Sequence, residues 1–149
     1  MTATTIQTVE EAENFLAKVF EILDSYDYER FSEIFATNLE YQGGLQTTSG
    51  LDDFIQDLKK SVAKMPGMKT SHTRFKNEIT NGGTIYSLGH STAIFPSHPD
   101  NPVTIPMIGV FTLVSEGPES GKIQDMKIYK DRLPFLALQQ QLPGMKKNA

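Results

Sequence analysis

Apolar positions recur every three to four residues in the first part of the chain and follow strand patterns in the later part. After Thr8, apolar side chains at helical spacing as far as Leu23 predict a first amphipathic helix. The same criteria predict a short helix at about residues 28–35, a strand at about 39–41 and a third helix at about 51–64. The first part of the chain is therefore expected to be mainly helical.

After Pro66-Gly67 the pattern becomes that of four successive strands, expected at about residues 68–79, 84–95, 103–115 and 122–130. Asn81-Gly82-Gly83 is a hairpin turn signal, and Pro106 indicates a bulge or an unpaired edge. A short amphipathic tail at about residues 134–142 is expected to pack against the body. Three helices followed by a four-strand meander predict one α+β domain over residues 1–149, with a highly curved antiparallel sheet.

Composition narrows the possible functions. The chain has 149 residues, a formal net charge of −4 and no cysteine. An acidic chain without a basic stripe argues against a nucleic-acid partner. Without cysteine, a disulfide, a thiolate nucleophile and a Cys-ligated zinc are excluded. No apolar run approaches the roughly 20 residues of a membrane span, and the N-terminus lacks the features of a signal peptide. We therefore expect a cytoplasmic protein, not bound to a membrane, with a small-molecule pocket.

The sequence shows no phosphate-binding loop, metal-ligand spacing or nucleophile elbow. Acid/base chemistry by His, Asp and Tyr remains, and no cofactor or metal is expected. Asp27 continues the row of Phe20 and Leu23, so we expect it to leave the first helix on its buried side. Two interpretations stay open for Asp27: a cap for the next helix, or a carboxylate that faces the cavity and orients a histidine.

The three histidines have different prospects. His72 lies in mid-strand on a polar face, which faces either solvent or a polar pocket. His90 lies in the next strand and is expected near His72 across the hairpin. His98 lies in a loop, where a solvated turn residue is the simpler interpretation. Among the other polar residues, Tyr41 is expected on an inward face, and Asp131 is either a surface ion pair or a helix cap.

Six stretches of the sequence carry a family resemblance: Val19–Asp27, Phe31–Phe35, Leu39–Tyr41, Lys69–His72, Asn81–Gly83 and Gly121–Asp131. Over about residues 9–142 the chain resembles scytalone dehydratase and the SnoaL-like proteins, of the nuclear-transport-factor-two-like superfamily. The resemblance implies a cone-shaped α+β barrel, with three N-terminal helices packed on a highly curved antiparallel sheet. It also implies a homodimer that pairs through the outer face of the sheet. Since this superfamily hosts many functions, the fold alone does not decide the activity.

The resemblance also implies a set of site residues. Scytalone dehydratase-like enzymes use a Tyr-Asp pair at the end of the first helix, a Tyr on the first strand and a His on the strand after the third helix. Carried over to this sequence, these residues are Tyr26, Asp27, Tyr41 and His72. The second family histidine corresponds to His98 or to His90, and the sequence leaves that choice open.

The chain also departs from the dehydratase pattern. The polar residues of the dehydratase's long strand are replaced by an apolar stretch that includes Met107, Gly109 and Phe111. We expect this stretch to form an apolar wall of the pocket, which indicates a more apolar substrate. Asp131 matches an Asp near the end of the last strand in SnoaL-like cyclases, and we expect it to contact substrate.

An Asp–His pair with Tyr hydroxyls in a dry pocket can perform enolisation, dehydration or ring closure by proton transfer. We therefore predict a cofactor-free isomerase, dehydratase or cyclase that acts on an aromatic or polyketide-type intermediate of secondary metabolism. The rival hypothesis is a non-catalytic ligand- or protein-binding module of the same fold. A separation between Asp and His well beyond hydrogen-bond reach, with no adjacent cavity, would favour the rival.

Overall fold

The computed structural model describes residues 6–139. Its helices are α1 (Val9–Ser25), the 3-10 helix η1 (Tyr28–Glu33), α2 (Leu51–Ala63) and α3 (Leu133–Gln139). Thr8 caps α1, because its hydroxyl accepts a hydrogen bond from the backbone N–H of Glu11 at 3.1 Å. None of the helices within residues 6–139 is both long and apolar enough to cross a membrane.

Six strands form one sheet in the order β2-β1-β6-β5-β4-β3. Their bounds are β1 (Phe35–Gly43), β2 (Gln46–Ser49), β3 (Lys69–Ile79), β4 (Thr84–Ile94), β5 (Val103–Leu113) and β6 (Ile123–Lys130). The predicted meander is present, because β3 to β6 pair antiparallel in chain order. The sheet is nevertheless mixed rather than antiparallel: after α2 the chain crosses to the far edge, and β6 returns beside β1 in a parallel pair.

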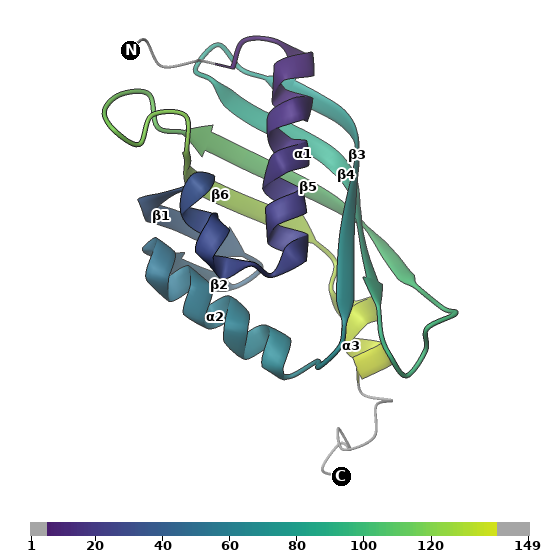
Figure 1. Ribbon diagram of the computed structural model, residues 1–149. Helices are drawn as coiled ribbons and strands as arrows, with labels where there is room; N and C mark the ends of the chain where they lie inside the picture. Colours follow the sequence, from purple (N-terminus) through teal and green to yellow (C-terminus); the bar gives the residue numbers. More distant parts are fainter. Residues whose placement is uncertain (1–5, 140–149) are drawn as a thin grey trace.

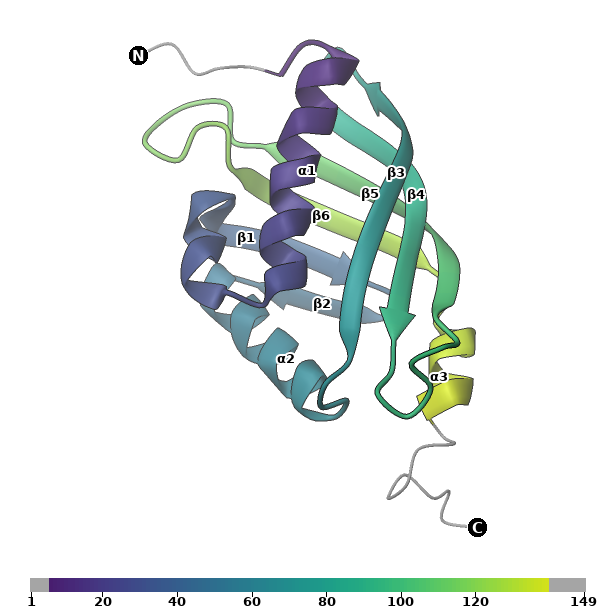
Figure 2. The same cartoon turned by 45° about the vertical axis from the view of Figure 1, so that its right-hand side comes forward.

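The helices cover one face of the curved sheet. Figures 1 and 2 show α1 lying across the strands on the β3 side, with η1 and α2 covering β1 and β2. The short α3 follows β6 and lies beside the start of β5. This arrangement, an α+β cone with three N-terminal helices, is the predicted fold class. It leaves space between α1, α2 and the strand ends, where the candidate site lies.

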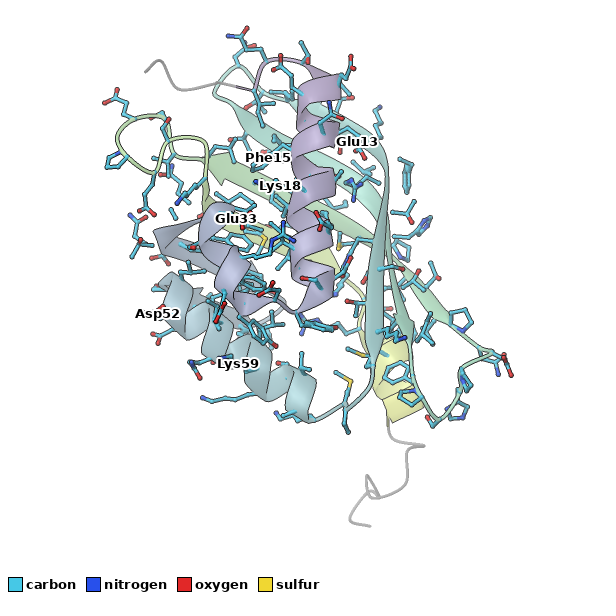
Figure 3. All side chains as sticks on the ribbon, in the orientation of Figure 1. Glu13, Phe15, Lys18, Glu33, Asp52 and Lys59 are labelled. Atoms are coloured by element: carbon cyan, nitrogen blue, oxygen red, sulfur yellow. The ribbon has the colours of Figure 1, made fainter. Side chains whose placement is uncertain are left out.

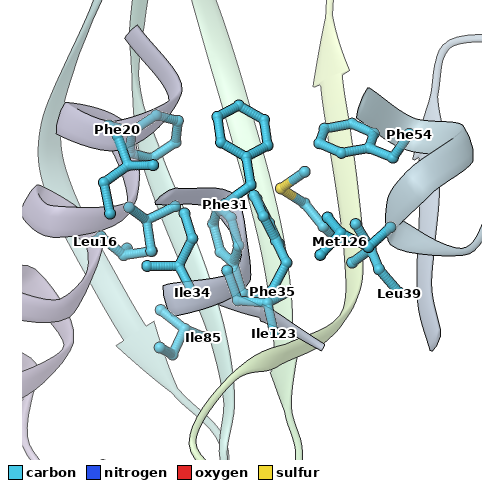
Figure 4. Close-up of a cluster of buried hydrophobic side chains, with 14 of the residues drawn as sticks. Leu16, Phe20, Phe31, Ile34, Phe35, Leu39, Phe54, Ile85, Ile123 and Met126 are labelled. Atoms are coloured by element: carbon cyan, nitrogen blue, oxygen red, sulfur yellow. The ribbon is translucent and has the colours of Figure 1, made fainter. Parts of the chain in front are cut away.

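A cluster of phenylalanines fills the wider part of the core between η1, β1 and α2 (Figure 4). The ring of Phe31 lies 5.8 Å from that of Phe35 and 6.3 Å from that of Phe54, measured between centroids. Phe31 and Phe35 are fully buried. Full burial of such a side chain contributes about 2 kcal/mol to folding. This part of the core packs β1 against α2 on one side of the cavity.

Polar contacts fix α1 against β3. The Glu13 carboxylate, which points from α1 toward β3 in Figure 3, accepts hydrogen bonds from the Arg74 guanidinium at 2.9 and 3.0 Å. The same carboxylate accepts a 2.7 Å hydrogen bond from the Asn77 side-chain amide. On the solvent side, the Lys18 ammonium lies 3.6 Å from the Glu33 carboxylate and links α1 to η1. The position of α1 on the sheet is therefore fixed by ionic as well as apolar contacts.

Two details refine the predicted elements. Pro106 lies on the part of β5 that extends beyond β6, because the β5–β6 register begins at Met107, so the predicted unpaired edge is correct. The predicted tail at 134–142 lies partly outside the described residues. Within them it forms α3, which begins at Leu133.

Candidate active site

The space between the end of α1, α2 and the sheet is a cavity with two adjoining sections, of about 190 and 400 Å³. The smaller section reaches toward the core, and its walls are mainly apolar: Phe20, Leu23, Val62, Met107, Met126 and Ile128. The larger section extends toward α3, where Arg132 and Phe135 line it. His72 and Lys130 line both sections, so the two sections form one continuous site.

The central contact of the site joins β3 to the last turn of α1. His72 Nδ1 lies 2.9 Å from Asp24 Oδ1 and 3.1 Å from Oδ2. The Thr70 hydroxyl donates a 2.8 Å hydrogen bond to the same Oδ1. Phe20, one helical turn before Asp24, stacks on the imidazole with ring centroids 4.6 Å apart. Both partners of the pair are therefore held in place by a second contact.

The hydrogen bonds define the protonation of the imidazole. A carboxylate can only accept, so the Asp24 contact places the proton of neutral His72 on Nδ1. Nε2 then carries a lone pair, and the buried Ser91 hydroxyl lies 3.2 Å from it. Asp24, His72 and Ser91 thus form a continuous hydrogen-bonded chain across α1, β3 and β4. Its imidazole is prepared to accept a proton at Nε2.

Two tyrosines add hydroxyl groups to the cavity wall. Tyr26 adopts a left-handed backbone conformation (φ 57°) at the end of α1, and its hydroxyl lies 3.1 Å from Thr70 Oγ1. Tyr41 comes from β1, and its ring packs against Phe54 at 4.9 Å between centroids. Burial raises the pKa of Tyr41, an effect opposed by the positive charge of Arg132 beside it. Tyr41 is therefore a protonated hydrogen-bond donor at neutral pH.

A glycine makes room for the Tyr41 ring. The backbone of Gly43 passes so close to the phenol that a Cβ at this position would overlap the Tyr41 hydroxyl. Leu39, Tyr41 and Gly43 alternate along β1 and share one face, as the period-two spacing predicts. The small residue at position 43 thus allows the hydroxyl to occupy its place in the site.

Positive charge enters the cavity from the end of β6. The pKa of Lys130 is lowered from 10.5 to about 8, mainly by burial and also by the positive charge of Arg132, while the charge of Asp24 opposes both effects. The Lys130 ammonium lies 5.7 Å from the centroid of the Phe135 ring. Lys130 still carries its charge in most molecules at neutral pH. The site therefore combines a base, hydroxyl donors and a cation on otherwise apolar walls.

Asp27 does not occupy its predicted place. It is exposed at the start of η1, and its side chain makes no capping hydrogen bond. The spacing that linked Leu23 to Asp27 assumed a helix that continues, whereas α1 ends at Ser25 and the chain turns at Tyr26. The carboxylate that meets His72 is Asp24, which the row from Phe20 reaches within the helix.

The two other histidines lie outside the cavity. In the β3–β4 register His72 faces Ser91, while His90 faces Thr73 and points to the opposite side of the sheet. His90 is exposed there and packs against Phe75 at 5.3 Å between ring centroids. His98 lies in the loop after β4, where its Nδ1 is 2.8 Å from the Ser97 hydroxyl. Neither supplies the second pocket histidine that the resemblance implies.

The predicted wall on β5 is only partly correct. Met107 lines the cavity. Phe111 instead belongs to the core, fully buried and edge-on to Phe20 at 6.1 Å. Gly109 serves that packing, since a Cβ there would lie 2.6 Å from the Phe111 ring. Asp131 is exposed, is not among the residues that line the cavity, and accepts a 2.9 Å hydrogen bond from the backbone N–H of Leu133 at the start of α3.

Sequence reasoning missed four residues of the site: Asp24, Thr70, Ser91 and Lys130. Asp24 had a usable signal, because it stands four residues after the inward-facing Phe20. Thr70 also had one, two positions before His72 on the same strand face. Ser91 and Lys130 depend on the pairing of strands, which the sequence of one strand does not reveal.

Solved structures resemble most of the chain in fold. No family model matches the sequence. ActVI-ORFA from Streptomyces coelicolor superposes with a TM-score of 0.68 at 12% identity, covering 82% of this chain and 93% of that one. A protein of Jannaschia Sp. CCS1, provisionally assigned as a SnoaL-like polyketide cyclase, gives 0.67 at 13% identity over 93% and 99% of the two chains. The fold is that of the SnoaL-like proteins in the nuclear-transport-factor-two-like superfamily.

A curated relative is far more similar in sequence. The sordarin/hypoxysordarin biosynthesis cluster protein G of Sordaria araneosa is 62% identical over 143 residues, which cover 96% of each chain. The chain belongs to the same family as this protein.

Proposed function

We propose that the protein is a cofactor-free enzyme of secondary metabolism that isomerises, dehydrates or cyclises a largely apolar intermediate. An aromatic or polyketide-type compound fits the cavity, with a carbonyl or hydroxyl group at the polar wall. The observation that carries the proposal is the hydrogen bond between Asp24 and His72 inside an apolar cavity. The relationship to a biosynthesis cluster protein supports the metabolic setting.

In this proposal His72 is the general base. Nε2 removes a proton from a carbon next to a carbonyl, directly or through the Ser91 hydroxyl, and Asp24 stabilises the imidazolium that forms. Tyr41 donates a hydrogen bond to the oxygen on which negative charge develops, and Tyr26 donates a second one after its hydroxyl turns from Thr70 to the substrate. The imidazolium of His72 then gives this proton back: to another carbon for isomerisation, to a departing hydroxyl group that leaves as water for dehydration, or to the alkoxide that forms when the enolate attacks a second carbonyl for ring closure. All three outcomes require the same residues.

The apolar walls supply the rest of the catalytic effect. Methionines from the loop after α2, from β5 and from β6 line the cavity: Met65, Met68, Met107 and Met126. Their flexible thioethers adapt to the shape of a bulky apolar ligand. A dry cavity strengthens the hydrogen bonds to the developing charge and folds a flexible substrate into a reactive conformation. Ring closure benefits most from such confinement.

Complementation tests the proposal in a setting where the substrate is made. A Sordaria araneosa strain that lacks cluster protein G would receive this chain, and its metabolites would be compared by mass spectrometry with those of the parent strain. We expect the wild-type chain to restore production, and the variants His72→Ala and Asp24→Asn to restore far less. The matched control is Asp27→Asn, which changes an exposed carboxylate three residues away.

The compound that accumulates in the deficient strain then serves as substrate for purified protein. Conversion by the wild-type protein without added metal or cofactor supports the enzyme. If wild-type protein binds the compound but leaves it unchanged, the binding-module hypothesis is correct instead. Full turnover by both His72→Ala and Asp24→Asn would show that the reaction does not use the proposed base.

A further inference from the structure

Lys130 and Arg132 bring two positive charges into the cavity that the proton-transfer chemistry does not use. Lys130 lines both sections of the cavity and Arg132 lines the larger one. Within residues 6–139, no Asp or Glu carboxylate forms an ion pair with either side chain. Residues 1–5 and 140–149 contain no Asp or Glu. In the described structure, therefore, neither Lys130 nor Arg132 forms an ion pair with a carboxylate of the protein.

The surroundings of Lys130 do not compensate its charge. The face of the Phe135 ring attracts the Lys130 ammonium only weakly, and Arg132 repels it. The carboxylate of Asp24 raises the pKa of Lys130, but it already binds His72 and Thr70. A partly buried cation without a partner is unfavourable. Its presence in a ligand cavity therefore indicates that the ligand supplies the missing negative charge.

We propose that the substrate carries a carboxylate, which Lys130 binds with Arg132 beside it at the wider end of the cavity. This inference rests on the proposed function and specifies its substrate: an apolar skeleton with one carboxylate. The apolar skeleton lies along the smaller section, against side chains such as Val62 and Met126. The carboxylate anchors the molecule, while His72 acts on a carbon further inside.

The lysine and the arginine have separate tasks in this arrangement. Lys130 reaches both sections of the cavity and makes the direct charge-assisted hydrogen bond. Arg132 lies beside the Tyr41 hydroxyl, so it adds positive potential and keeps that hydroxyl oriented. A neutral ligand of the same shape would leave both charges without a partner and would bind more weakly.

A matched pair of probes tests the inference without knowledge of the true substrate. The probes are 1-naphthoate, which is anionic at pH 7, and 1-naphthamide, its neutral counterpart of the same shape. Affinities for the purified full chain would be measured by isothermal titration calorimetry. We expect the wild-type protein to bind naphthoate about tenfold more tightly than naphthamide. Equal affinities, or no naphthoate binding at millimolar concentration, would overturn the inference.

Variants locate the effect on one side chain. Lys130→Met and Lys130→Gln should abolish the preference for naphthoate, and Lys130→Arg should retain most of it. The control is Lys127→Met on the same strand, because the alternation of β6 turns Lys127 away from Met126, Ile128 and Lys130. Persistence of the preference in both Lys130→Met and Lys130→Gln would contradict the assignment, provided that circular dichroism shows folded protein.

The probe assay is independent of the proposed base. His72→Ala should still prefer naphthoate, even though it fails in the turnover assay. A protein that prefers naphthoate but never converts the accumulated compound would refute the proposed function and leave the carboxylate site intact. Conversely, if Lys130→Met turns over the compound with an unchanged KM, the proposal of an enzyme stands and the anchoring role of Lys130 is wrong.

Discussion

Phe20 and His72, from α1 and β3, stack with ring centroids 4.6 Å apart and an angle of 27° between their planes. Phe20 also lies one helical turn before Asp24, which binds the same imidazole. One face of α1 therefore supplies both the carboxylate that fixes the tautomer of His72 and the ring that fixes its plane. The guanidinium of Arg74 lies 5.5 Å from the centre of the Phe20 ring and adds a further contact.

Shortening the Phe20 side chain should loosen the imidazole. We expect Phe20→Leu to reduce kcat about tenfold, because a base that is less well oriented transfers a proton less efficiently. The loss of buried area should cost about 1 kcal/mol of unfolding free energy. Urea unfolding would measure the stability and steady-state kinetics the turnover. An unchanged kcat would show that the stacking has no catalytic role.

Ser91 tests whether the proton leaves the substrate directly. Its hydroxyl is the protein group at His72 Nε2, at 3.2 Å. If it relays the proton, Ser91→Ala should lower kcat about 10-fold or more with little change in KM. If the substrate displaces this contact and reaches Nε2 itself, Ser91→Ala should leave kcat near the wild-type value. Comparison with Ser91→Thr, which retains a hydroxyl, separates the loss of the proton relay from altered packing.

Lys130 should make the protein less stable at neutral pH than an apolar residue in its place. The folded-state pKa is lowered from 10.5 to about 8, which corresponds to a penalty of about 3 kcal/mol while the amine is charged. The penalty is complete below pH 8 and disappears as the pH rises toward 10.5. We therefore expect Lys130→Met to be more stable than wild type at pH 7, with the difference shrinking toward pH 10.5.

Chemical denaturation of both proteins across this pH range would check the prediction. Tyr41, whose raised pKa also makes stability depend on pH, is present in both proteins. Its contribution therefore cancels when the two unfolding free energies are subtracted. Lys127→Met serves as the control, with no comparable pH-dependent gain expected. A stability difference between Lys130→Met and wild type that stays constant from pH 7 to pH 10.5 would show that Lys130 carries no burial penalty.

The outer face of the sheet carries exposed apolar side chains from neighbouring strands, and we propose that it forms a homodimer. Ile108 and Tyr129 are register partners there and are 42% and 52% exposed. A lysine at position 108 would place a charge in the interface, so Ile108→Lys should elute as a monomer in gel filtration. The control is Leu45→Lys, at the exposed turn after β1. A monomeric wild-type protein at micromolar concentration would contradict the proposal.

The sequence predicts much of the fold, because helix and strand periodicities are local. The α1 stripe, the Asn81-Gly82-Gly83 hairpin and the meander all follow from residues close together in the chain. The parallel β1–β6 pair does not, because it joins strands separated by most of the chain. Its sequence signal is weak, since β1 and β6 alternate in much the same way as antiparallel strands do.

The candidate site shows the same limit at the level of single residues. His72 lies on the cavity side of β3, and Tyr26 and Tyr41 line the same cavity. The carboxylate at His72 is Asp24 and not the predicted Asp27, because the position of that side chain depends on where α1 ends, and helix ends are defined only to within one or two residues. His90 was misplaced for a related reason, because a shift of one residue in strand register moves a side chain to the other face.

The most direct test of the proposed base compares the turnover of two variants, Asp24→Asn and Asp27→Asn. The substrate is the compound that accumulates in the strain without cluster protein G. Asparagine keeps the size of the side chain but removes the charge that stabilises the imidazolium. We predict that Asp24→Asn lowers kcat about 10²-fold while Asp27→Asn retains the wild-type value. Equal turnover in the two variants would contradict the pairing of Asp24 with His72 as the catalytic unit.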